Sequence, residues 1–241
     1  MTIPEQAAAL VTGASRGIGA ECAKALANKG LPVAIGYLSD KDGALETQAQ
    51  CPGSIVVNID VRDSESVSAA FDEVVHELGP VLILVNNAGI TRDRVLIRMK
   101  LQDWDDVINT DLTGVFRCTH IALPGMLAAR WGRVVSTGSI VGSTGNPGQT
   151  NYAAAKAGLI GFSKSLAREV GRHGVTVNVV APGLVETELT LSLSEAAKGE
   201  MLKKTSTGRA SSPSEVAEAV GFCVESANLT GQVIHVDGGM N

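Results

Sequence analysis

The chain has 241 residues, of which 44% are hydrophobic and 19% charged, and its formal net charge is −5. This length suits one α/β domain with a substantial core, and the negative charge argues against a nucleic-acid-binding surface. No apolar run reaches the ~18 residues of a bilayer-spanning helix, and no secretory signal begins the chain. Because the four cysteines lack metal-ligand spacing, we expect reduced thiols, no metal and a cytoplasmic protein.

The first predicted element is an apolar strand over residues 7–11. The sequence TGASRGIG (residues 12–19) follows it and opens a helix. A strand, a glycine-rich turn and a helix together are typical of a dinucleotide site, because the helix N-terminus offers free N–H groups to phosphate. Gly13 suits the tight turn, and Gly17 and Gly19 allow close approach of a ligand, although the spacing G-x-x-x-G-x-G is not the commonest one.

The second predicted strand, residues 32–37, bears on the choice of cofactor. An acidic residue at the end of this strand binds the ribose 2′-hydroxyl in dinucleotide folds. Tyr37 stands there instead, and Asp40 comes three residues later. Arg16 in the glycine turn can reach a 2′-phosphate, with Ser39 and Lys41 as secondary candidates. These residues favour NADP(H) over NAD(H); the alternative for Arg16 is a solvated loop arginine.

A third strand over residues 55–59 and a fourth over 81–85 flank a predicted helix over 64–78. The third strand ends at Asp60 and Val61, which suit the amino group and ring face of adenine; the alternative for Asp60 is a helix cap. The fourth strand is apolar throughout, as in a parallel sheet buried on both faces. NNAG (residues 86–89) follows it, at the sheet edge where ligands bind.

A long helical stretch is predicted over residues 101–129, with a kink because it contains Asn109, Asp111, Gly114 and Pro124. A strand over 133–137 comes next, and then the segment SIVGSTGNPGQTNYAAAK (residues 139–156). Its glycines and Pro147 predict a non-helical middle. Thr150 or Asn151 is expected to cap the following helix, over 151–173.

Tyr152 and Lys156 lie four residues apart on that helix, so they share one face. A phenol titrates near ~10 in water, but a lysine cation and the positive helix end beside it favour the phenolate. Tyr152 can then exchange a proton near neutral pH, while Ser139 binds a carbonyl oxygen. This arrangement favours ketone reduction or alcohol oxidation; the alternative is that Tyr152 and Lys156 are merely neighbours.

A sixth strand over 175–180, a helix over 213–224 and a last strand over 232–236 complete the chain. Residues 184–208 form a long polar insertion, for which we expect a substrate lid. The alternation of strands and helices predicts a Rossmann-like α/β fold: one doubly wound parallel sheet of about seven strands, with helices on both faces, in a single domain over 1–241. Ala154, Ala157, Gly158 and Gly161 suit close packing, against a second subunit or against the same subunit's sheet.

The chain resembles the short-chain dehydrogenase/reductase family over its whole length. The family's motifs occur here in the family's order: TGASRGIG, NNAG, Ser139 with Tyr-x-x-x-Lys, and APG (residues 181–183). Within the family, the chain is most similar to the members that reduce 3-oxoacyl thioesters of acyl carrier protein. This likeness is carried by the stretches NAGITRDRVLIRMK, GNPGQTNYAAAKAGLIGFSKSLARE and VDGGM. The resemblance implies NADPH-dependent reduction to the 3-hydroxyacyl thioester in type II fatty acid synthesis.

The resemblance also implies residue roles. Tyr152 is the acid, Lys156 favours its phenolate and holds the nicotinamide ribose, and Ser139 orients the carbonyl. The family has an asparagine in the long helix that completes a proton relay, whereas this chain has Asp111, which should stabilise the lysine cation and alter the pH profile. The residues expected at the cofactor are Gly13, Ser15, Arg16, Gly17, Ile18, Gly19, Asp60, Val61, Asn87, Ala88, Gly89, Tyr152, Lys156, Pro182, Gly183, Val185 and Thr187.

The expected partners are an acyl carrier protein and further copies of the chain, since the family assembles as homotetramers. Arg130 and Arg172 are the candidates for a basic docking patch and Arg133 is a weaker one; the alternative is solvated surface arginines. Two other functions stay open. One is a related reductase acting on acyl-CoA, a polyketide, a sugar or a small ketone, and the other is a non-catalytic nucleotide-binding protein.

Overall fold

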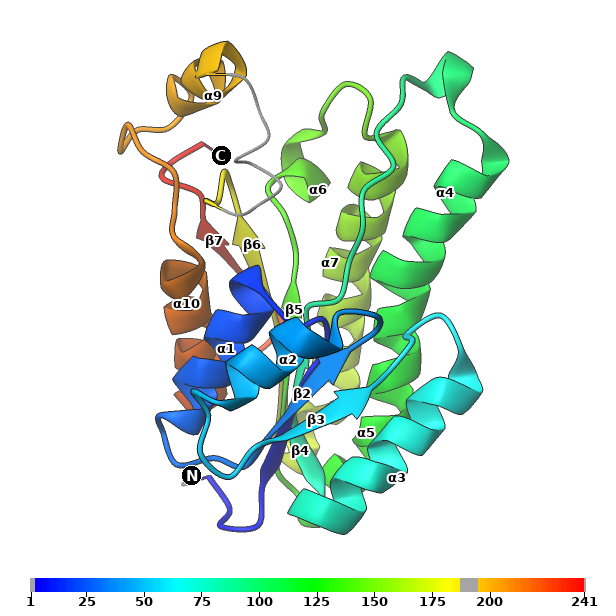
Figure 1. Cartoon of the computed structure of the whole chain (residues 1–241), viewed down its shortest axis with the longest axis vertical. Helices are drawn as coiled ribbons and strands as arrows, with labels where there is room; N and C mark the ends of the chain where they lie inside the picture. Colours follow the sequence, from blue (N-terminus) through cyan, green and yellow to red (C-terminus); the bar gives the residue numbers. More distant parts are fainter. Residues whose placement is uncertain (1–2, 187–194, 241) are drawn as a thin grey trace.

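The structure, a computed structural model, describes residues 3–186 and 195–240. Its described strands form one seven-stranded sheet in the order β3-β2-β1-β4-β5-β6-β7 (Figure 1). Every neighbouring pair is parallel, which confirms the predicted fold class. The strands are β1 (Ala8–Val11), β2 (Val33–Tyr37), β3 (Ile55–Asn58), β4 (Val81–Asn86), β5 (Gly132–Thr137), β6 (Val175–Pro182) and β7 (Val233–Val236).

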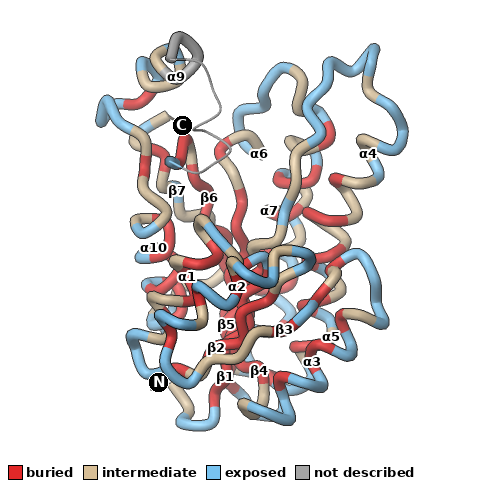
Figure 2. The backbone as a smooth tube through the Cα atoms, viewed as in Figure 1, coloured by how far each residue is buried: buried red, intermediate tan, exposed pale blue. Residues whose placement is uncertain are grey.

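Helices cover both faces of the sheet (Figure 1). On one face α1 (Gly17–Ala27) packs against α10 (Pro213–Glu225), with α2 (Lys41–Gln48) beside α1. On the other face lie α3 (Ser64–Leu78), α5 (Gly114–Ala129) and α7 (Thr150–Val170). The central strands β1, β4, β5 and β6 are buried throughout, β4 as its apolar sequence predicts, whereas the edge strands β3 and β7 are partly exposed (Figure 2). The remaining helices are α4 (Leu101–Ile108), α6 (Val141–Thr144) and α9 (Glu195–Leu202), with 3₁₀ turns at Leu96–Arg98 and Gly171–His173. Within the described ranges, no helix is both long and apolar enough to cross a membrane.

The structure corrects several local predictions. The segment after β5 is not wholly irregular, because α6 forms one helical turn within it. Helix α7 begins at Thr150 with Gln149 as its cap residue, so neither Thr150 nor Asn151 is the cap. The expected break in the long helix is a π-helical segment, Asn109–Thr113, between α4 and α5, whereas Pro124 lies inside α5. β6 also continues through Pro182, beyond its predicted end.

Arg133 was wrongly predicted as a surface docking candidate. It is 1% exposed, and its guanidinium donates to carbonyl oxygens of Val224 at 2.9 Å, Gly132 at 2.8 Å and Gly174 at 3.2 Å. These contacts join the start of β5 to the end of α10 and to the turn before β6. Burial lowers the Arg133 pKa, and the carbonyls satisfy its donors, so Arg133 holds the fold together at this edge.

Thr12 joins the carboxyl ends of β1 and β4. Its buried hydroxyl accepts hydrogen bonds from the backbone N–H groups of Asn87 and Ala88, each at 3.0 Å. The Asn87 side-chain amide donates in return to the carbonyl oxygens of Thr12 at 3.1 Å and Gly13 at 2.9 Å. The glycine turn and the NNAG turn are therefore fixed to each other where a ligand would lie.

We expect Thr12→Val to lower the free energy of unfolding by roughly 1–3 kcal/mol, because a side chain of similar shape leaves these N–H groups without their acceptor. Thr12→Ser is the matched control; it keeps the hydroxyl and loses one methyl group, worth about 1 kcal/mol at most. Urea unfolding measures both changes. A valine variant as stable as the parent protein would contradict the role of the hydroxyl.

Candidate functional site

The segment that carries Ser139 lies against the first turns of α7. Gly138 N donates to Val180 O at 2.7 Å and Ile140 N to Pro182 O at 2.9 Å, so the chain follows β6 after leaving β5. α6 then packs on α7 so closely that a Cβ at Gly142 would lie 2.8 Å from the carbonyl carbon of Lys156. Gly142, which the sequence indicated as a helix breaker, is therefore a close-packing residue inside a helical turn.

Lys156 is the buried cation of the site, with 4% exposure. Its ammonium donates to Thr137 O at 2.9 Å and lies 3.1 Å from Asp111 Oδ2 and 5.4 Å from the centroid of the Tyr152 ring. Burial lowers the pKa of Lys156, but the charges of Asp111 and Tyr152 outweigh burial, and the net pKa is raised. Lys156 is thus charged at neutral pH. Since an ammonium carries three N–H groups, one remains for a ligand oxygen.

Asp111 is completely buried in the π-helical segment, and such segments are frequent at functional sites. Its Oδ1 accepts a hydrogen bond from Ile90 N at 2.9 Å. A Cβ at Gly89 would approach Asp111 Oδ2 to 2.7 Å, so the glycine of NNAG makes room for the carboxylate. Asn109, which the sequence excluded from the site, instead accepts from Arg117 Nη1 at 3.0 Å.

Neither hydroxyl group of the predicted catalytic set donates a hydrogen bond within the described residues. Ser139 Oγ accepts from Val141 N at 3.2 Å, which orients the oxygen and leaves its O–H as a donor. Tyr152 is half-buried on the first turn of α7, and its backbone N–H donates to Asn151 Oδ1 at 2.8 Å. Among the described residues, no hydrogen bond engages the Tyr152 hydroxyl.

Sequence reasoning missed three supporting residues. Thr12 holds the two turns together, Thr137 binds Lys156 through its carbonyl oxygen, and Asn151 donates to Arg92 O at 3.1 Å and Asp103 O at 2.9 Å. Thr12 and Asn151 lie inside the recognised motifs, so their position was a usable signal. Thr137 binds Lys156 through its backbone, and no pattern of side chains reveals such a contact.

The glycine turn fits a dinucleotide phosphate. Arg16, the cap residue of α1, is extended and makes no side-chain capping bond, so the first N–H groups of the helix remain for an anion. Gly13 has φ +64°, and a Cβ there would lie 2.9 Å from Ala88 Cα. A Cβ at Gly19 would lie 2.3 Å from Gly13 O. Side chains at Gly13 and Gly19 would thus meet neighbouring backbone, so these two glycines allow the close packing of the turn.

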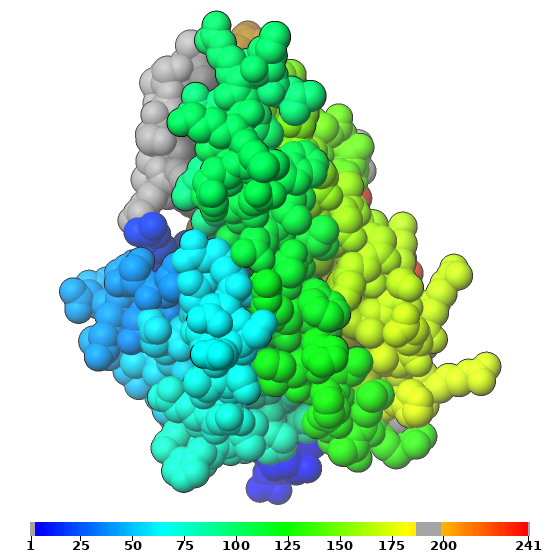
Figure 3. Space-filling model, turned by 90° about the vertical axis from the view of Figure 1, so that its right-hand side faces the viewer, coloured from blue at the N-terminus to red at the C-terminus, as the bar shows by residue number. Residues whose placement is uncertain are grey.

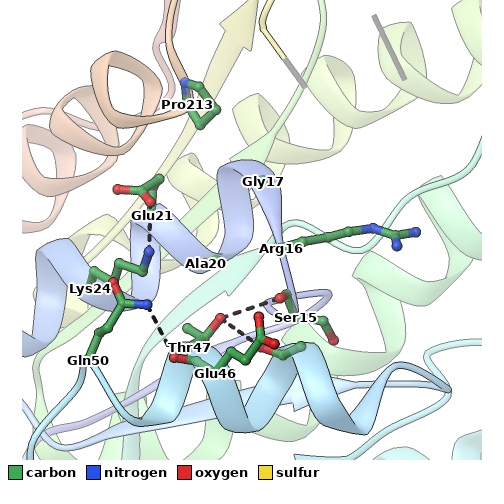
Figure 4. A pocket seen from close by; sticks show the side chains of 11 residues that line it. Ser15, Arg16, Gly17, Ala20, Glu21, Lys24, Glu46, Thr47, Gln50 and Pro213 are labelled. Atoms are coloured by element: carbon green, nitrogen blue, oxygen red, sulfur yellow. Dashed lines mark hydrogen bonds and ion pairs between the residues drawn. The ribbon is translucent and has the colours of Figure 1, made fainter. Parts of the chain in front are cut away.

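The structure places Asp40 nearer to the glycine turn than its sequence position indicates. Its carboxylate lies 3.7 Å from the Arg16 guanidinium and also caps α2 by accepting from Gly43 N at 3.1 Å. Ser15 Oγ donates to Asp40 O at 2.8 Å. A pocket of about 300 Å³ lies between α1 and α2 beside this turn, and the Arg16 side chain extends away from Lys24 and Glu46 (Figure 4). The pocket contains no catalytic candidate.

Asp60 is paired with Arg62, whose Nε and Nη2 donate to its two oxygens at 2.9 Å and 2.7 Å. The hydrogen bonds from Arg62 lower the pKa of Asp60. Asp63 is the cap of α3, accepting from Glu65 N at 2.9 Å, so the alternative of Asp60 as a cap was wrong. An adenine amino group at Asp60 must therefore share it with Arg62.

The remaining cofactor candidates follow β3 and β6. Val61 is buried against Gly114, where a Cβ would lie 2.8 Å from Val61 Cγ2. Pro182 ends β6, and Val185 pairs with Ser211 in a parallel bridge. A Cβ at Gly183 would lie 2.8 Å from Asp237 Cα, so Gly183 also marks a close approach of two backbones. Thr187 and part of the predicted lid lie outside the described residues.

The cysteines offer no nucleophile. Burial raises the pKa of Cys22 and Cys118 to about 12 and that of Cys223 to about 11, and it also raises the pKa of Cys51. All four are free and buried. Buried thiols with raised pKa values are poor nucleophiles, so the candidate chemistry does not rest on them.

Known proteins resemble the chain over nearly its whole length. Residues 13–241 match the family described as Enoyl-(Acyl carrier protein) reductase. The chain is 48% identical over 237 residues to the 3-oxoacyl-[acyl-carrier-protein] reductase FabG of Vibrio harveyi, with 96% of each chain covered. The same reductase of Escherichia coli strain K12 is 48% identical over 236 residues, again with 96% of each covered. That of Staphylococcus aureus strain Mu50 is 47% identical over 238 residues, which are 96% of this chain and 97% of the relative. These matches, together with the parallel sheet of the fold, show that the chain belongs to the short-chain dehydrogenase/reductase family.

Proposed function

We propose that the protein is an NADPH-dependent 3-oxoacyl-[acyl-carrier-protein] reductase that forms 3-hydroxyacyl thioesters in type II fatty acid synthesis. The observation that carries the proposal is the buried Lys156 cation beside Tyr152, on a segment packed against the one that bears Ser139. The relatives with this printed name, at 47–48% identity, supply the substrate class. We place the reaction in the cytoplasm, which suits four free thiols.

The residues divide the chemistry between them. When bound, NADPH would supply the hydride for the 3-oxo carbon. The Ser139 hydroxyl donates a hydrogen bond to the carbonyl oxygen and orients it, and the Tyr152 hydroxyl gives its proton to that oxygen. The Lys156 ammonium stabilises the resulting phenolate, and its remaining N–H is the candidate to hold a ribose hydroxyl of the cofactor. The glycine turn at Gly13–Gly19 would hold the pyrophosphate at the α1 N-terminus.

The preference for NADP(H) rests on Arg16 and on the absence of a carboxylate from the end of β2, which is Tyr37. A 2′-phosphate beside Arg16 would also approach Asp40, since the two side chains are 3.7 Å apart. Asp40 has its own role as the cap of α2, so it can keep that hydrogen bond while the phosphate takes the guanidinium. On cofactor binding, the 2′-phosphate would thus take the place of the Asp40 carboxylate beside the Arg16 guanidinium.

We also propose a homotetramer. Supporting it, Phe116 on α5 is 51% exposed, and Ala154, Ala157 and Gly161 are exposed at helical spacing on α7. Figure 3 shows this side of the molecule, where the residues of α4 and α5 (green) extend alongside those of α7 (yellow-green). Exposed small and aromatic side chains on neighbouring helices suit close packing against another copy.

The carrier-docking candidates lie far from the site of their own subunit. Arg130 precedes β5 and Arg172 follows α7, so both are exposed at the amino ends of strands whose carboxyl ends lead to the site. Helical rise along α7 separates Arg172 from Tyr152 by about 30 Å. We infer that a carrier bound by Arg130 and Arg172 serves the site of a neighbouring subunit, which links docking to assembly.

We expect fast oxidation of NADPH, and slower oxidation of NADH, with an acetoacetyl thioester carried on acyl carrier protein or on CoA. Tyr152→Phe should reduce kcat by about 10²–10⁴-fold, because it removes the proton donor and little else. NADPH binding, followed by fluorescence, is the control and should persist. Turnover of other ketones but neither thioester would favour a different reductase, and tight NADPH binding without any turnover would favour the non-catalytic alternative.

We expect Arg130→Glu with Arg172→Glu to lower kcat/KM for the carrier-bound substrate by about tenfold or more, since an acidic partner loses two attractive contacts and gains two repulsive ones. Turnover of a small ketoester should not change. Arg168→Glu, also exposed near the end of α7, is the matched control for charge alone. Equal losses with both substrates would show that the arginines do not act through docking.

A further inference from the structure

Asp111 stands where the resemblance implies an asparagine, and its carboxylate has a specific place in the site. We propose that Asp111 is a positioning residue that ties the segment after β4 to the Lys156 ammonium and offsets the field of that cation at the Tyr152 phenol. The inference rests on the proposed function for the role of Tyr152. Its test needs neither substrate nor turnover.

The two oxygens of Asp111 have different partners. Oδ1 accepts from the backbone N–H of Ile90 at 2.9 Å, and Oδ2 lies 3.1 Å from Lys156 Nζ. The carboxylate is 0% exposed and the lysine side chain 5% exposed, so solvent screens this pair little. Removing one member of such a pair leaves the other as an uncompensated buried charge, so each holds the other in place. One side chain therefore connects the NNAG turn with α7.

The surroundings of the ammonium show why a negative charge matters there. β5 contributes only the neutral Thr137 carbonyl, at 2.9 Å. The titratable groups that act on Lys156 are Asp111 from the π-helical segment and Tyr152 from α7 itself; burial lowers the Lys156 pKa, and these two groups more than reverse the effect. The Asp111 carboxylate at 3.1 Å therefore gives the Lys156 ammonium a counter-charge that does not come from Tyr152.

The same counter-charge limits how far Lys156 favours the phenolate. An isolated ammonium acts on the phenol with its full field, whereas an ammonium paired at 3.1 Å acts as a dipole, whose field falls faster with distance. An asparagine at this position keeps the size of the side chain and an acceptor for Ile90 N–H, but it removes the negative charge. Asp111→Asn should therefore make phenolate formation easier, and Lys156→Met should make it harder.

Absorbance of the phenolate measures this directly, because Tyr37 and Tyr152 are the only tyrosines of the chain. In a Tyr37→Phe background, Tyr152 is titrated by ultraviolet absorbance in the full-length protein without substrate. We expect Asp111→Asn to lower the midpoint of Tyr152 ionisation by about one pH unit, the usual effect of one nearby charge. Asn109→Asp is the matched control; it adds a carboxylate two residues away, facing Arg117, and should leave the midpoint unchanged.

A midpoint that is unchanged or raised in Asp111→Asn would overturn the proposal. So would a shift of similar size and opposite sign in Asn109→Asp, because the effect would then follow net charge rather than the pair. If the titration exceeds the pH range of the folded state, urea unfolding at neutral pH decides. We expect the double variant Lys156→Met/Asp111→Asn to unfold at a higher urea midpoint than Lys156→Met alone, because the single variant leaves the buried carboxylate without its partner. A lower midpoint for the double variant would contradict the proposal. Failure to reduce any thioester, with these shifts intact, would count against the proposed function alone.

Discussion

The buried ammonium of Lys156 is the constraint on which the site depends. A cation with 4% exposure needs fixed partners, and three elements supply them: Thr137 at the end of β5, Asp111 in the π-helical segment, and the Tyr152 ring one turn earlier on α7. α6 also packs closely on α7 beside this lysine, since a Cβ at Gly142 would lie 2.8 Å from the carbonyl carbon of Lys156. The geometry around Tyr152 thus follows from the need to satisfy one buried charge.

The parallel sheet explains why distant segments meet. All strands run the same way, so the turns after β1, β4, β5 and β6 lie along one edge, and the strand order reverses between β1 and β4, where a dinucleotide binds in such folds. Thr12 fixes the first two turns to each other, and the hydrogen bonds of Gly138 and Ile140 fix the third to the fourth. Thr137 Oγ1 also donates to Asn87 Oδ1 at 3.2 Å, which links the second turn to the third, so the candidate cofactor and catalytic segments form one hydrogen-bonded edge.

The charged groups of this edge are already paired within the subunit. Arg16 faces Asp40 and Arg62 holds Asp60, both near the surface, whereas Lys156 and Asp111 are paired in the interior. Exposed pairs are weak, so a ligand can exchange partners with them at small cost. The interior pair is different, because both side chains are buried and a ligand cannot reach Lys156 from the side on which Asp111 lies. The exposed pairs at the candidate cofactor residues can therefore rearrange on binding, whereas the Lys156–Asp111 pair is part of the fold.

The sequence by itself determined the alternation of strands and helices and the glycine turn, and it predicted Ser139, Tyr152 and Lys156 as a candidate set, because periodicity, glycine spacing and helical i, i+4 geometry are local properties. It also indicated that Asp111, and not Asn109, belongs near the lysine. Only the tertiary structure decided that Arg133 is buried, that Asp40 faces Arg16, that Asp60 is held by Arg62, and that Thr137 binds Lys156 through its carbonyl oxygen. Each of these contacts depends on packing between elements distant in the sequence or on backbone atoms that every residue shares. Such contacts cannot be predicted from the local pattern of side chains.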